Sequence, residues 1–463
     1  MPTLLNPPRS VLSIEGLAAL ARVRAGCAWW EDDAGKLEWP QFAAAVETVR
    51  QTCLASGVQP GEVVVTPGDS TAAALVWLLG AAAAGAVVAP LRSERHGEIQ
   101  NWANFIRIHW QERERRLDPI NRGENSEPAR GLLTELRGRN HAGLILATGG
   151  TTGIPKIVLH DLNVLLATVP VKHGPAKRLL PLMRFDHIGG LDMAFRALAG
   201  RHVLVAPPAD LTPAAVAATI ARHEVDVLPA TPSFLNLLLL AEAHSGGALD
   251  SLRVVPYGAE AMPAGLLARL RAALPQVEFV QRFGTSETGA LPVDDGGEGL
   301  MLRSDDPAYA WKILDGELWV RSPARALGYL SGEGRGFDVD GWFRTGDLAE
   351  TLPDGAIRVL GRREELINVG GEKIFPSEVE NVLLAHPQVA DCRVGAEPSA
   401  VLGQVVIAEI VWRGPEVDAI QVKKILHVHA AGRLTRHKWP AVIRLVASIG
   451  TTRNGKKPRL LSA

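Results

Sequence analysis

The hydrophobic and polar positions of this chain alternate between two patterns over most of its first 290 residues. Short apolar or β-branched runs such as 62–66 and 144–146 are typical of buried strands, and segments such as 38–56 have helical spacing. Strands that alternate with helices indicate βαβ units and a parallel sheet. After residue 200 the same pattern predicts strands at 203–206, 225–228, 252–256 and 277–279, and helices at 213–224, 232–244 and 263–273.

One uncharged stretch of 21 residues, 71–91, is long enough to span a bilayer. It is mostly alanine, contains two glycines and has a proline near its end, so its transfer into lipid would be poorly favoured. We therefore predict a buried helix over 71–84, followed by a buried strand through Val87 and Val88, rather than a membrane span.

Residues 92–140 interrupt the alternation with a charged and polar segment. Arg113, Arg115 and Arg116 lie close together, but acidic residues are interleaved with them and no aromatic platform accompanies them. These two features disfavour a nucleic-acid-binding patch. We predict a solvated helix here, followed by a surface loop around 121–130.

Beyond residue 290 the pattern changes twice. From 298 to 360, short strands are separated by Gly and Asp-Gly pairs, which predicts an antiparallel β-rich subdomain. From 362 onward helices and strands mix, with helices expected at 377–385 and 418–430 and strands at 405–411 and 443–448. The expected fold class is α/β, with an N-terminal domain over 1–361 that contains the β-rich subdomain (about 298–360) and a C-terminal α+β domain over 362–463.

Composition narrows the function classes. A chain of 463 residues with 47% hydrophobic and 21% charged residues is long enough for two to four globular domains. Its 49 basic and 50 acidic side chains nearly cancel, which gives no general electrostatic reason to bind nucleic acid or an anionic membrane. The three cysteines, Cys27, Cys53 and Cys392, are far apart, and residues 1–9 lack the features of a signal peptide. We expect a soluble cytoplasmic protein.

The densest chemical signal is the stretch 147–156, ATGGTTGIPK, which follows a predicted strand. Glycines allow backbone N–H groups to approach an anion, and threonine hydroxyls and a lysine add donors and positive charge. The spacing differs from the Walker pattern because Lys156 follows a proline. We interpret this stretch as a polyphosphate-binding loop; the alternative is an ordinary Gly-rich turn.

Three further stretches carry residue types that a nucleotide site needs. In 282–288, Glu287 could hold Mg²⁺ beside a polyphosphate, and in 340–347, Asp347 could accept hydrogen bonds from ribose hydroxyls. The segment 361–373 joins a charge cluster to a double glycine at the predicted domain boundary. Taken singly, these stretches could equally be a solvated turn, a hairpin turn and a linker.

Taken together, in this order and spacing, the stretches closely resemble the adenylate-forming superfamily of acyl- and aryl-CoA synthetases, luciferases and adenylation domains. The loop 148–156 resembles its phosphate loop, with Gly149 where serine is commoner. Residues 283–287 resemble its YGxTE motif, with phenylalanine for tyrosine and serine for threonine. The other matches are Thr345-Gly346-Asp347 with the TGD motif, Gly361-Arg362 with the start of the hinge motif, and 453–459 with the C-terminal NGKxxR motif.

The resemblance implies a fold with two βα-layered sheets and a β-rich subdomain in the N-terminal domain, and a small mobile C-terminal domain. It also implies a two-step reaction. A carboxylate attacks the α-phosphate of ATP·Mg to give an acyl-adenylate and pyrophosphate, and the thiol of CoA or of a carrier phosphopantetheine then takes the acyl group.

The resemblance also implies roles for single residues. Lys456 would bridge carboxylate and phosphate, Ser286 would contact the α-phosphate, and Glu287 would ligate Mg²⁺. Asp347 and Arg362 would fix the ribose. The β- and γ-phosphates would be held by Thr148, Thr151, Thr152 and Lys156 in a loop shaped by Gly149, Gly150 and Gly153. The adenine pocket would be formed by Gly258, Ala259, Glu260, Phe283 and Gly284.

Two positions depart from the family pattern. Glu364 stands where the hinge usually has Asp or Lys, so the effect on the domain swing is open. The usual histidine motif after the phosphate loop appears as 184–190, and His187 is expected near the acyl carboxylate and the thiol channel. The alternative for His187 is a structural histidine bonded to Asp186.

The acid itself is not specified by the sequence. The expected pocket walls, 185–193, 233–238 and 255–259, are largely apolar, which favours an aromatic or aliphatic acid over an amino acid. We expect an acyl-CoA synthetase-like ligase. The alternatives are a stand-alone adenylating enzyme that loads a carrier protein or forms an amide, and a non-catalytic nucleotide-binding relic.

Overall fold

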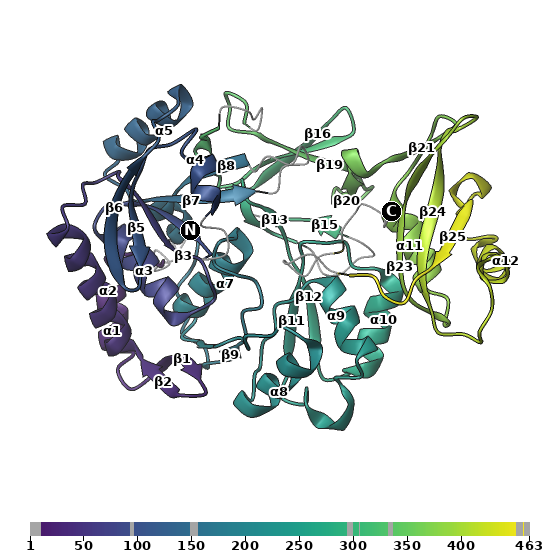
Figure 1. The fold of residues 1–463 in the computed structure, drawn as a ribbon, viewed down its shortest axis with the longest axis horizontal. Coiled ribbons are helices and arrows are strands. Elements are labelled where there is room, and N and C mark those ends of the chain that lie inside the picture. The colour runs from purple at the N-terminus through teal and green to yellow at the C-terminus, as the bar shows by residue number, and fades with distance from the viewer. Residues whose placement is uncertain are drawn as a thin grey trace, which may run out of the picture.

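The computed structural model describes residues 11–92, 97–148, 156–293, 300–304, 306–331, 337–450 and 457. It is a mixed α/β structure, and its described strands form sheets of seven, five, five, four, two and two strands. The chain runs from the N-terminal part, drawn in purple and blue, to the C-terminal domain, drawn in yellow-green and yellow (Figure 1). The expected fold class is confirmed. The boundary near residue 361 stays a prediction.

The largest sheet has seven strands in the order β18-β8-β7-β4-β3-β5-β6. Its central strands β7, β4, β3 and β5 run parallel, and β8 and β6 are antiparallel to their neighbours. The strands are β3 (Val63–Pro67), β4 (Val87–Leu91), β5 (Ile108–Arg113), β6 (Arg116–Arg122), β7 (Gly143–Thr148), β8 (Lys156–Asp161) and β18 (Gly328–Tyr329).

Helices cover both faces of this sheet, which explains why its central strands are almost continuously apolar. Val64 and Val88 pack against one face with α2 and α3, whereas Val63 and Val87 pack against α4 and α5 on the other. These helices and their neighbours are α1 (Leu17–Val23), α2 (Trp39–Ala55), α3 (Ala72–Ala83), α4 (Ile99–Trp102), α5 (Glu127–Gly138), α6 (Leu162–Ala167) and α7 (Ile188–Ala199).

Helices α2 and α3 pack closely because of one glycine. A Cβ at Gly80 of α3 would lie 2.5 Å from Cβ of Val49 on α2, so a larger residue would force the helices apart. The uncharged stretch 71–91 thus forms a 12-residue helix and a buried strand, as predicted. None of the helices in the described ranges is long and apolar enough to cross a membrane.

The prediction for 92–140 is wrong in part. Instead of a solvated helix and a surface loop, residues 108–122 form the hairpin β5–β6, which extends the large sheet beyond β3. Helices do occur in the described part of the insert, namely the short α4 before this hairpin and α5 after it. The charges misled the prediction because an edge hairpin can expose polar side chains while its backbone completes the sheet.

A second sheet has the order β2-β1-β10-β9 and contains β1 (Ala28–Asp32), β2 (Gly35–Glu38), β9 (Arg178–Leu179) and β10 (Val203–Val205). The parallel pair β11 (Val254–Tyr257) and β12 (Glu278–Gln281) lies next to it. The strand predicted at 225–228 is reduced to bridges at Val227, which pairs with Leu179 and Val254. A core under this sheet is built with α8 (Pro213–His223), α9 (Pro232–Leu240) and α10 (Ala264–Ala273).

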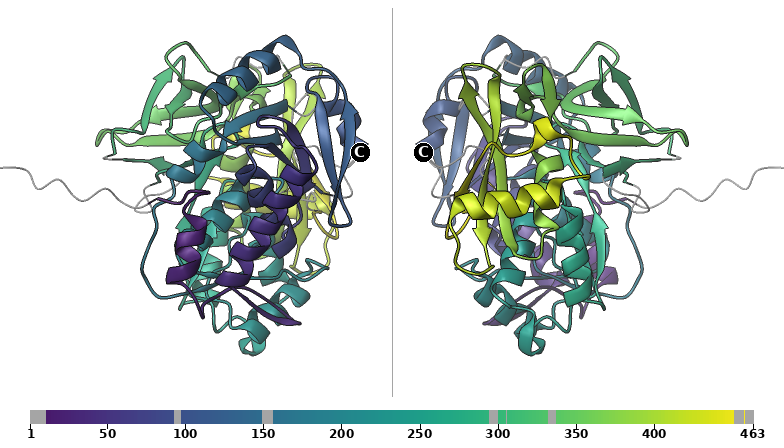
Figure 2. Two further views of the ribbon diagram at one scale, coloured as in Figure 1. Left: turned by 90° about the vertical axis from the view of Figure 1, so that its left-hand side faces the viewer. Right: turned by 90° about the vertical axis from the view of Figure 1, so that its right-hand side faces the viewer.

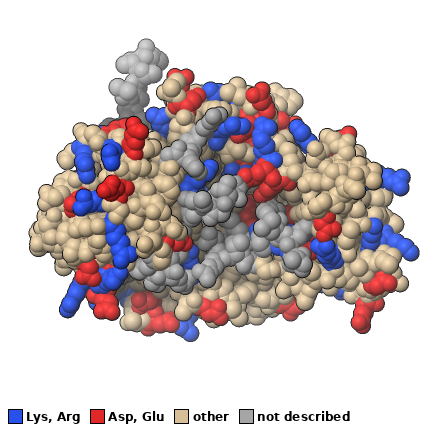
Figure 3. Space-filling view, turned by 45° about the horizontal axis from the view of Figure 1, so that its top comes forward, with Lys and Arg blue, Asp and Glu red and all other residues tan. Residues whose placement is uncertain are grey.

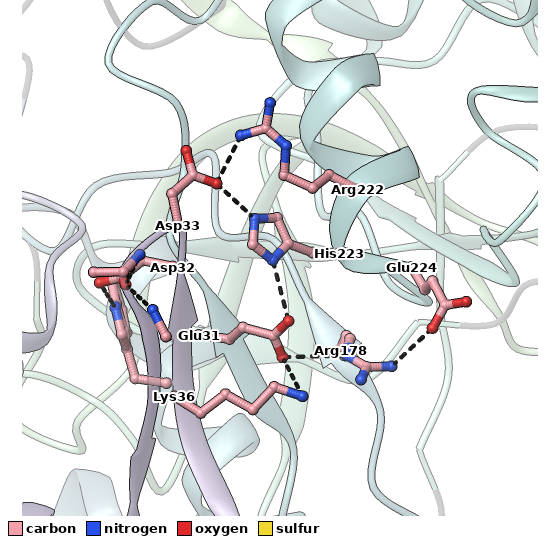
Figure 4. A network of polar contacts seen from close by, with 11 residues as sticks. Glu31, Asp32, Asp33, Lys36, Arg178, Arg222, His223 and Glu224 are labelled. Atoms are coloured by element: carbon pink, nitrogen blue, oxygen red, sulfur yellow. Dashed lines mark hydrogen bonds and ion pairs between the residues drawn. The ribbon is translucent and has the colours of Figure 1, made fainter.

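A polar network joins α8 to strand β1 and the turn that follows it (Figure 4). The two ring nitrogens of His223 face Glu31 Oε1 at 3.1 Å and Asp33 Oδ1 at 3.2 Å. Burial alone would raise the pKa of Glu31, but the contact with His223 and the cations Lys36 and Arg178 outweigh it and lower that pKa. The network therefore holds α8 against β1 and belongs to the framework.

The predicted β-rich subdomain is present as an antiparallel sheet in the order β15-β20-β19-β17-β16, beside the hairpin β13–β14. The elements are β13 (Phe283–Thr285), β14 (Gly289–Leu291), β15 (Leu300–Leu302), β16 (Ala310–Leu314), β17 (Glu317–Arg321), β19 (Phe343–Thr351) and β20 (Ile357–Arg362).

The C-terminal domain has its own sheet and core, with α12 lying in front in the right-hand view of Figure 2. Its strands have the order β22-β21-β24-β23, and β25 pairs with β24 in parallel. The elements are β21 (Ile367–Val369), β22 (Glu372–Ile374), α11 (Pro376–Leu384), β23 (Val389–Ser399), β24 (Gly403–Trp412), α12 (Ala419–Ala430) and β25 (Val442–Leu445).

Positive and negative side chains are interspersed over the face of the molecule drawn in Figure 3.

Candidate active site

Lys156, at the end of the predicted phosphate loop, and Glu287, the predicted metal ligand, both contact Tyr329. Lys156 begins β8, and its Nζ lies 5.7 Å from the ring centroid of Tyr329 on the neighbouring strand β18. The phenol of Tyr329 donates a 2.7 Å hydrogen bond to Glu287 Oε1. Burial raises the pKa of Tyr329, and the Glu287 carboxylate raises it further, so the phenol stays a donor. The predicted phosphate ligand and the predicted metal ligand therefore share one neighbour.

A second contact fixes the backbone before Glu287. His160, on β8, is buried, and its Nε2 donates a 2.7 Å hydrogen bond to the carbonyl of Ser286. Burial lowers the pKa of His160 from its ordinary value near 6.5 to about 4. The imidazole is therefore neutral at physiological pH, with its proton on Nε2.

The turn that carries Ser286 and Glu287 is also held from within. The hydroxyl of Thr285 accepts hydrogen bonds from the N–H groups of Glu287 and Thr288, each at 3.2 Å. Gly284 is required in the flanking hairpin because a Cβ there would lie 2.3 Å from the Gly289 carbonyl oxygen. Thus the residues around Glu287 form a rigid turn, as a site for a charged ligand requires.

The predicted ribose ligands lie opposite each other on two adjacent antiparallel strands. Asp347 on β19 is in register with Arg362 on β20, and Arg362 Nε lies 3.0 Å from Asp347 Oδ1. Arg362 also donates to the Thr345 carbonyl at 2.7 Å. Asp347 Oδ2 is buried without a hydrogen-bond partner in the described ranges. Burial raises the pKa of Asp347, and the nearby guanidinium opposes this.

The unpartnered Asp347 Oδ2 indicates whether a nucleotide fits this site. A buried carboxylate oxygen costs free energy unless it accepts hydrogen bonds, and sugar hydroxyls are suitable donors. Arg362 is also close enough to Tyr329 to lower its pKa electrostatically, so the Asp347–Arg362 pair lies near the Glu287 turn. The residues present therefore suit a ribose and its phosphates, with the Glu287 carboxylate available for Mg²⁺.

The predicted adenine-pocket residues lie at the end of β11 and the start of β13. Ala259 has φ +68°, and a Cβ at Gly258 would lie 2.5 Å from the Arg282 carbonyl oxygen, so the two segments cross closely. Phe283 follows directly on β13. Glu260 has another set of contacts: it accepts the Ser233 N–H through Oε2 at 3.2 Å and the Lys457 N–H through Oε1 at 2.6 Å. A role in the adenine pocket stays a prediction for these residues.

His187 precedes the first residue of α7, and its Nε2 lies 3.5 Å from Asp186 Oδ1. Asp186 is buried and accepts a 2.8 Å hydrogen bond from Arg92 Nε. This contact corresponds to the structural alternative for His187, while its position in an acyl channel stays a prediction.

Several predicted residues lie outside the described ranges. They are Gly149, Gly150, Thr151, Thr152, Gly153 and Lys456, and for Thr148 only the backbone is described. Two residues at the site were missed by sequence analysis, namely Tyr329 and His160. The spacing of His160 from Lys156 was a usable signal, because positions i and i+4 of a strand face the same side.

Comparisons with known proteins identify the family of this chain. A family model described as AMP-binding enzyme matches residues 111–330, and one described as AMP-binding enzyme C-terminal domain matches residues 378–456. Pyochelin synthase PchD of Pseudomonas aeruginosa is 32% identical over 345 residues, which cover 67% of this chain and 60% of that protein. The L-proline–[L-prolyl-carrier protein] ligase of Pseudomonas fluorescens is 29% identical over 349 residues, covering 69% of this chain and 68% of the relative.

Solved structures give the same result for the fold. The anthranilate CoA ligase AuaEII, in complex with anthranoyl-AMP, matches with a TM-score of 0.78 at 19% identity, over 99% of this chain and 97% of that chain. The described architecture, the two family models and these relatives agree. The chain belongs to the adenylate-forming superfamily of AMP-binding enzymes.

Proposed function

We propose that this protein activates an aromatic or aliphatic carboxylic acid with ATP and Mg²⁺ and then transfers the acyl group to the thiol of CoA. The single observation that carries the proposal is the buried Asp347 carboxylate, which is paired with Arg362 and has one oxygen left for a hydroxyl donor. It lies near a turn that presents Ser286 and Glu287 beside Lys156.

In the first step a substrate carboxylate oxygen forms a bond to the α-phosphorus of ATP, and the bond to the pyrophosphate oxygen breaks. The phosphorus gathers negative charge, so positioning and positive charge lower the barrier more than covalent help from the protein would. Lys456 supplies a cation to the carboxylate and the α-phosphate, and Lys156 holds the departing phosphates. Glu287 would hold Mg²⁺, which would supply positive charge to the phosphates.

In the second step the thiol sulfur forms a bond to the acyl carbonyl carbon, the thiol proton passes to water, and AMP leaves. Asp347 and Arg362 keep AMP in place until this bond forms. His187 is expected near the acyl carboxylate and the thiol channel, and its ring Nε2 lies 3.5 Å from Asp186 Oδ1.

The choice of acid rests on the predicted pocket walls. Phe185, Phe234 and Val255 in these walls are buried among apolar neighbours. The acidic residues in these walls are already paired with arginines, since Asp186 is buried against Arg92 and Asp192 is paired with Arg196. This arrangement supports an uncharged acyl group over an amino acid.

ATP–pyrophosphate exchange over a panel of aromatic, aliphatic and amino acids tests the first step. Exchange above background with at least one aromatic or aliphatic acid is expected, and exchange with amino acids alone would contradict the proposed substrate class. No exchange with any acid would instead favour a non-catalytic nucleotide-binding protein.

A second candidate acceptor is a carrier phosphopantetheine or an amine. It is favoured by relatives of this chain whose names include a carrier-protein ligase and an amide bond synthetase. Parallel product assays with CoA, a phosphopantetheinylated carrier protein and simple amines distinguish these outcomes, and a thioester with CoA is the expected product.

A further inference from the structure

Lys457 lies at the interface between the N-terminal part and the C-terminal domain. Its backbone N–H donates a 2.6 Å hydrogen bond to Glu260 Oε1, in the loop after β11. Its Nζ donates to Asp391 Oδ1 at 2.5 Å and to the Cys392 carbonyl at 2.9 Å, both on β23. One residue of the tail is therefore bonded to both parts of the molecule.

This contact is buried and charged. Side-chain exposure is 13% for Lys457 and 5% for Asp391. Burial alone would lower the pKa of Lys457, but Asp391, together with Cys392 and Glu380, outweighs burial and raises it. A buried ion pair contributes little net stability. Separation of its partners leaves a buried charge uncompensated, so the pair favours the one arrangement in which the two charges meet.

The two carboxylates that bind Lys457, those of Glu260 and Asp391, are anchored in different domains. The second carboxylate oxygen of Glu260 accepts the Ser233 N–H near the N-terminus of α9, so this side chain is fixed before it receives the tail. The Asp391 carboxylate also accepts the Cys392 N–H at 2.9 Å. Lys457 thus joins two carboxylates that are each held by their own domain.

Helix packing brings these domains together at the same place. A Cβ at Gly265 of α10 would lie 3.3 Å from the backbone of Ala385, which follows α11, so the two helices approach closely. Arg269, one turn further along α10, is near enough to Asp391 to be affected electrostatically. The segment after β25 runs back toward α9 and α10 (Figure 1).

We propose that Lys457, Asp391 and Glu260 form a tail clasp that positions Lys456 for the adenylation step. The inference rests on the proposed function, since it takes Lys456 as the cation of that step. Lys456 is the chain neighbour of Lys457, and adjacent Cα atoms are about 3.8 Å apart across a trans peptide bond. The Lys457 N–H that binds Glu260 belongs to the peptide bond that joins Lys457 to Lys456, so the clasp acts at the chain position next to Lys456.

The clasp acts on one half-reaction only. It holds the C-terminal domain in the orientation described here, and a domain swing toward the thiol step would break the bonds between Lys457 and Glu260. Lys457, Asp391 and Glu260 are positioning residues: weakening the clasp should slow adenylation and leave acyl transfer from a ready-made adenylate unchanged.

The test measures both half-reactions in Lys457→Gln, Asp391→Asn and the double variant of the full chain, with the exposed Lys424→Gln on α12 as the matched control. Each single variant should lower pyrophosphate exchange about 10- to 100-fold, the range expected for one lost charge-assisted hydrogen bond. Thioester formation from synthetic acyl-adenylate should change less than about twofold, and the double variant should be no slower than the slower single variant.

Each other outcome has a definite meaning. Equal losses in both half-reactions, or multiplying losses in the double variant, would refute the clasp. If Lys457→Gln does not fold, Gly265→Leu weakens the same interface from α10, and the same kinetic split is required of it. Wild-type protein that shows no exchange with any acid refutes the proposed function and the clasp with it, whereas active wild type with equally active variants refutes the clasp alone.

Discussion

Acid stability offers a direct test of the contact that holds the Glu287 turn. His160 is neutral in the folded protein because burial lowers its pKa to about 4, whereas an unfolded chain has a histidine pKa near 6.5. Between these values the unfolded state binds more protons, so the free energy of unfolding rises with pH. The contribution of neutral His160 to the free energy of unfolding is therefore fully present above pH 6.5 and is lost progressively as the pH falls to 4.

The magnitude follows from the size of the shift. Each pKa unit corresponds to about 1.4 kcal/mol, so His160 accounts for about 3 kcal/mol of lost stability across this window. That loss is a large fraction of the 5 to 15 kcal/mol typical of a domain, roughly speaking. It should appear in the unfolding transition of the N-terminal part, where His160 lies between β7 and β18.

The assay is urea denaturation at pH values from 7 to 4, followed by circular dichroism, on wild type and His160→Gln. Glutamine keeps an N–H donor for the Ser286 carbonyl but does not titrate, so its stability should fall about 3 kcal/mol less than that of wild type on acidification. The exposed His173→Gln controls for loss of a histidine. Parallel pH profiles for wild type and His160→Gln would refute the reasoning.

Four further outcomes are expected. Lys456→Ala should abolish pyrophosphate exchange and leave thioester formation from acyl-adenylate largely intact; equal loss in both assays would remove its proposed role. Tyr329→Phe removes the donor to Glu287 and should raise the Mg²⁺ concentration for half-maximal exchange about tenfold; an unchanged Mg²⁺ profile would exclude that link. Asp347→Asn should raise the KM for ATP about tenfold or more through weaker acceptance of hydroxyl donors, and an unchanged KM would argue against ribose binding. Gly80→Leu should lower the free energy of unfolding by about 1 to 3 kcal/mol in urea titrations through overpacking of α2 on α3, and wild-type stability would contradict the close approach.

Much of the fold could be predicted from the local pattern of the sequence. The helix α3 and the strand β4 follow from an uncharged, alanine-rich stretch, and α11, β24, α12 and β25 appear within a few residues of their predicted positions. These elements depend on periodicity and on breakers, which act between near neighbours in the chain. The hairpin β5–β6 was missed because a charged segment becomes a strand only when a partner backbone, here β3, offers hydrogen bonds.

The sequence by itself determined the order of the motifs, the residue types of the proposed phosphate, metal and ribose ligands, and the family. Only the tertiary structure decided which distant residues meet. Tyr329 reaches Glu287 across 42 positions, and Lys457 reaches Glu260 across 197. It also decided which groups are buried, and hence that His160 is neutral and Asp347 retains an unpartnered oxygen. The reason is physical: burial, pKa and the pairing of charges depend on the surrounding atoms, and most of these come from remote parts of the chain.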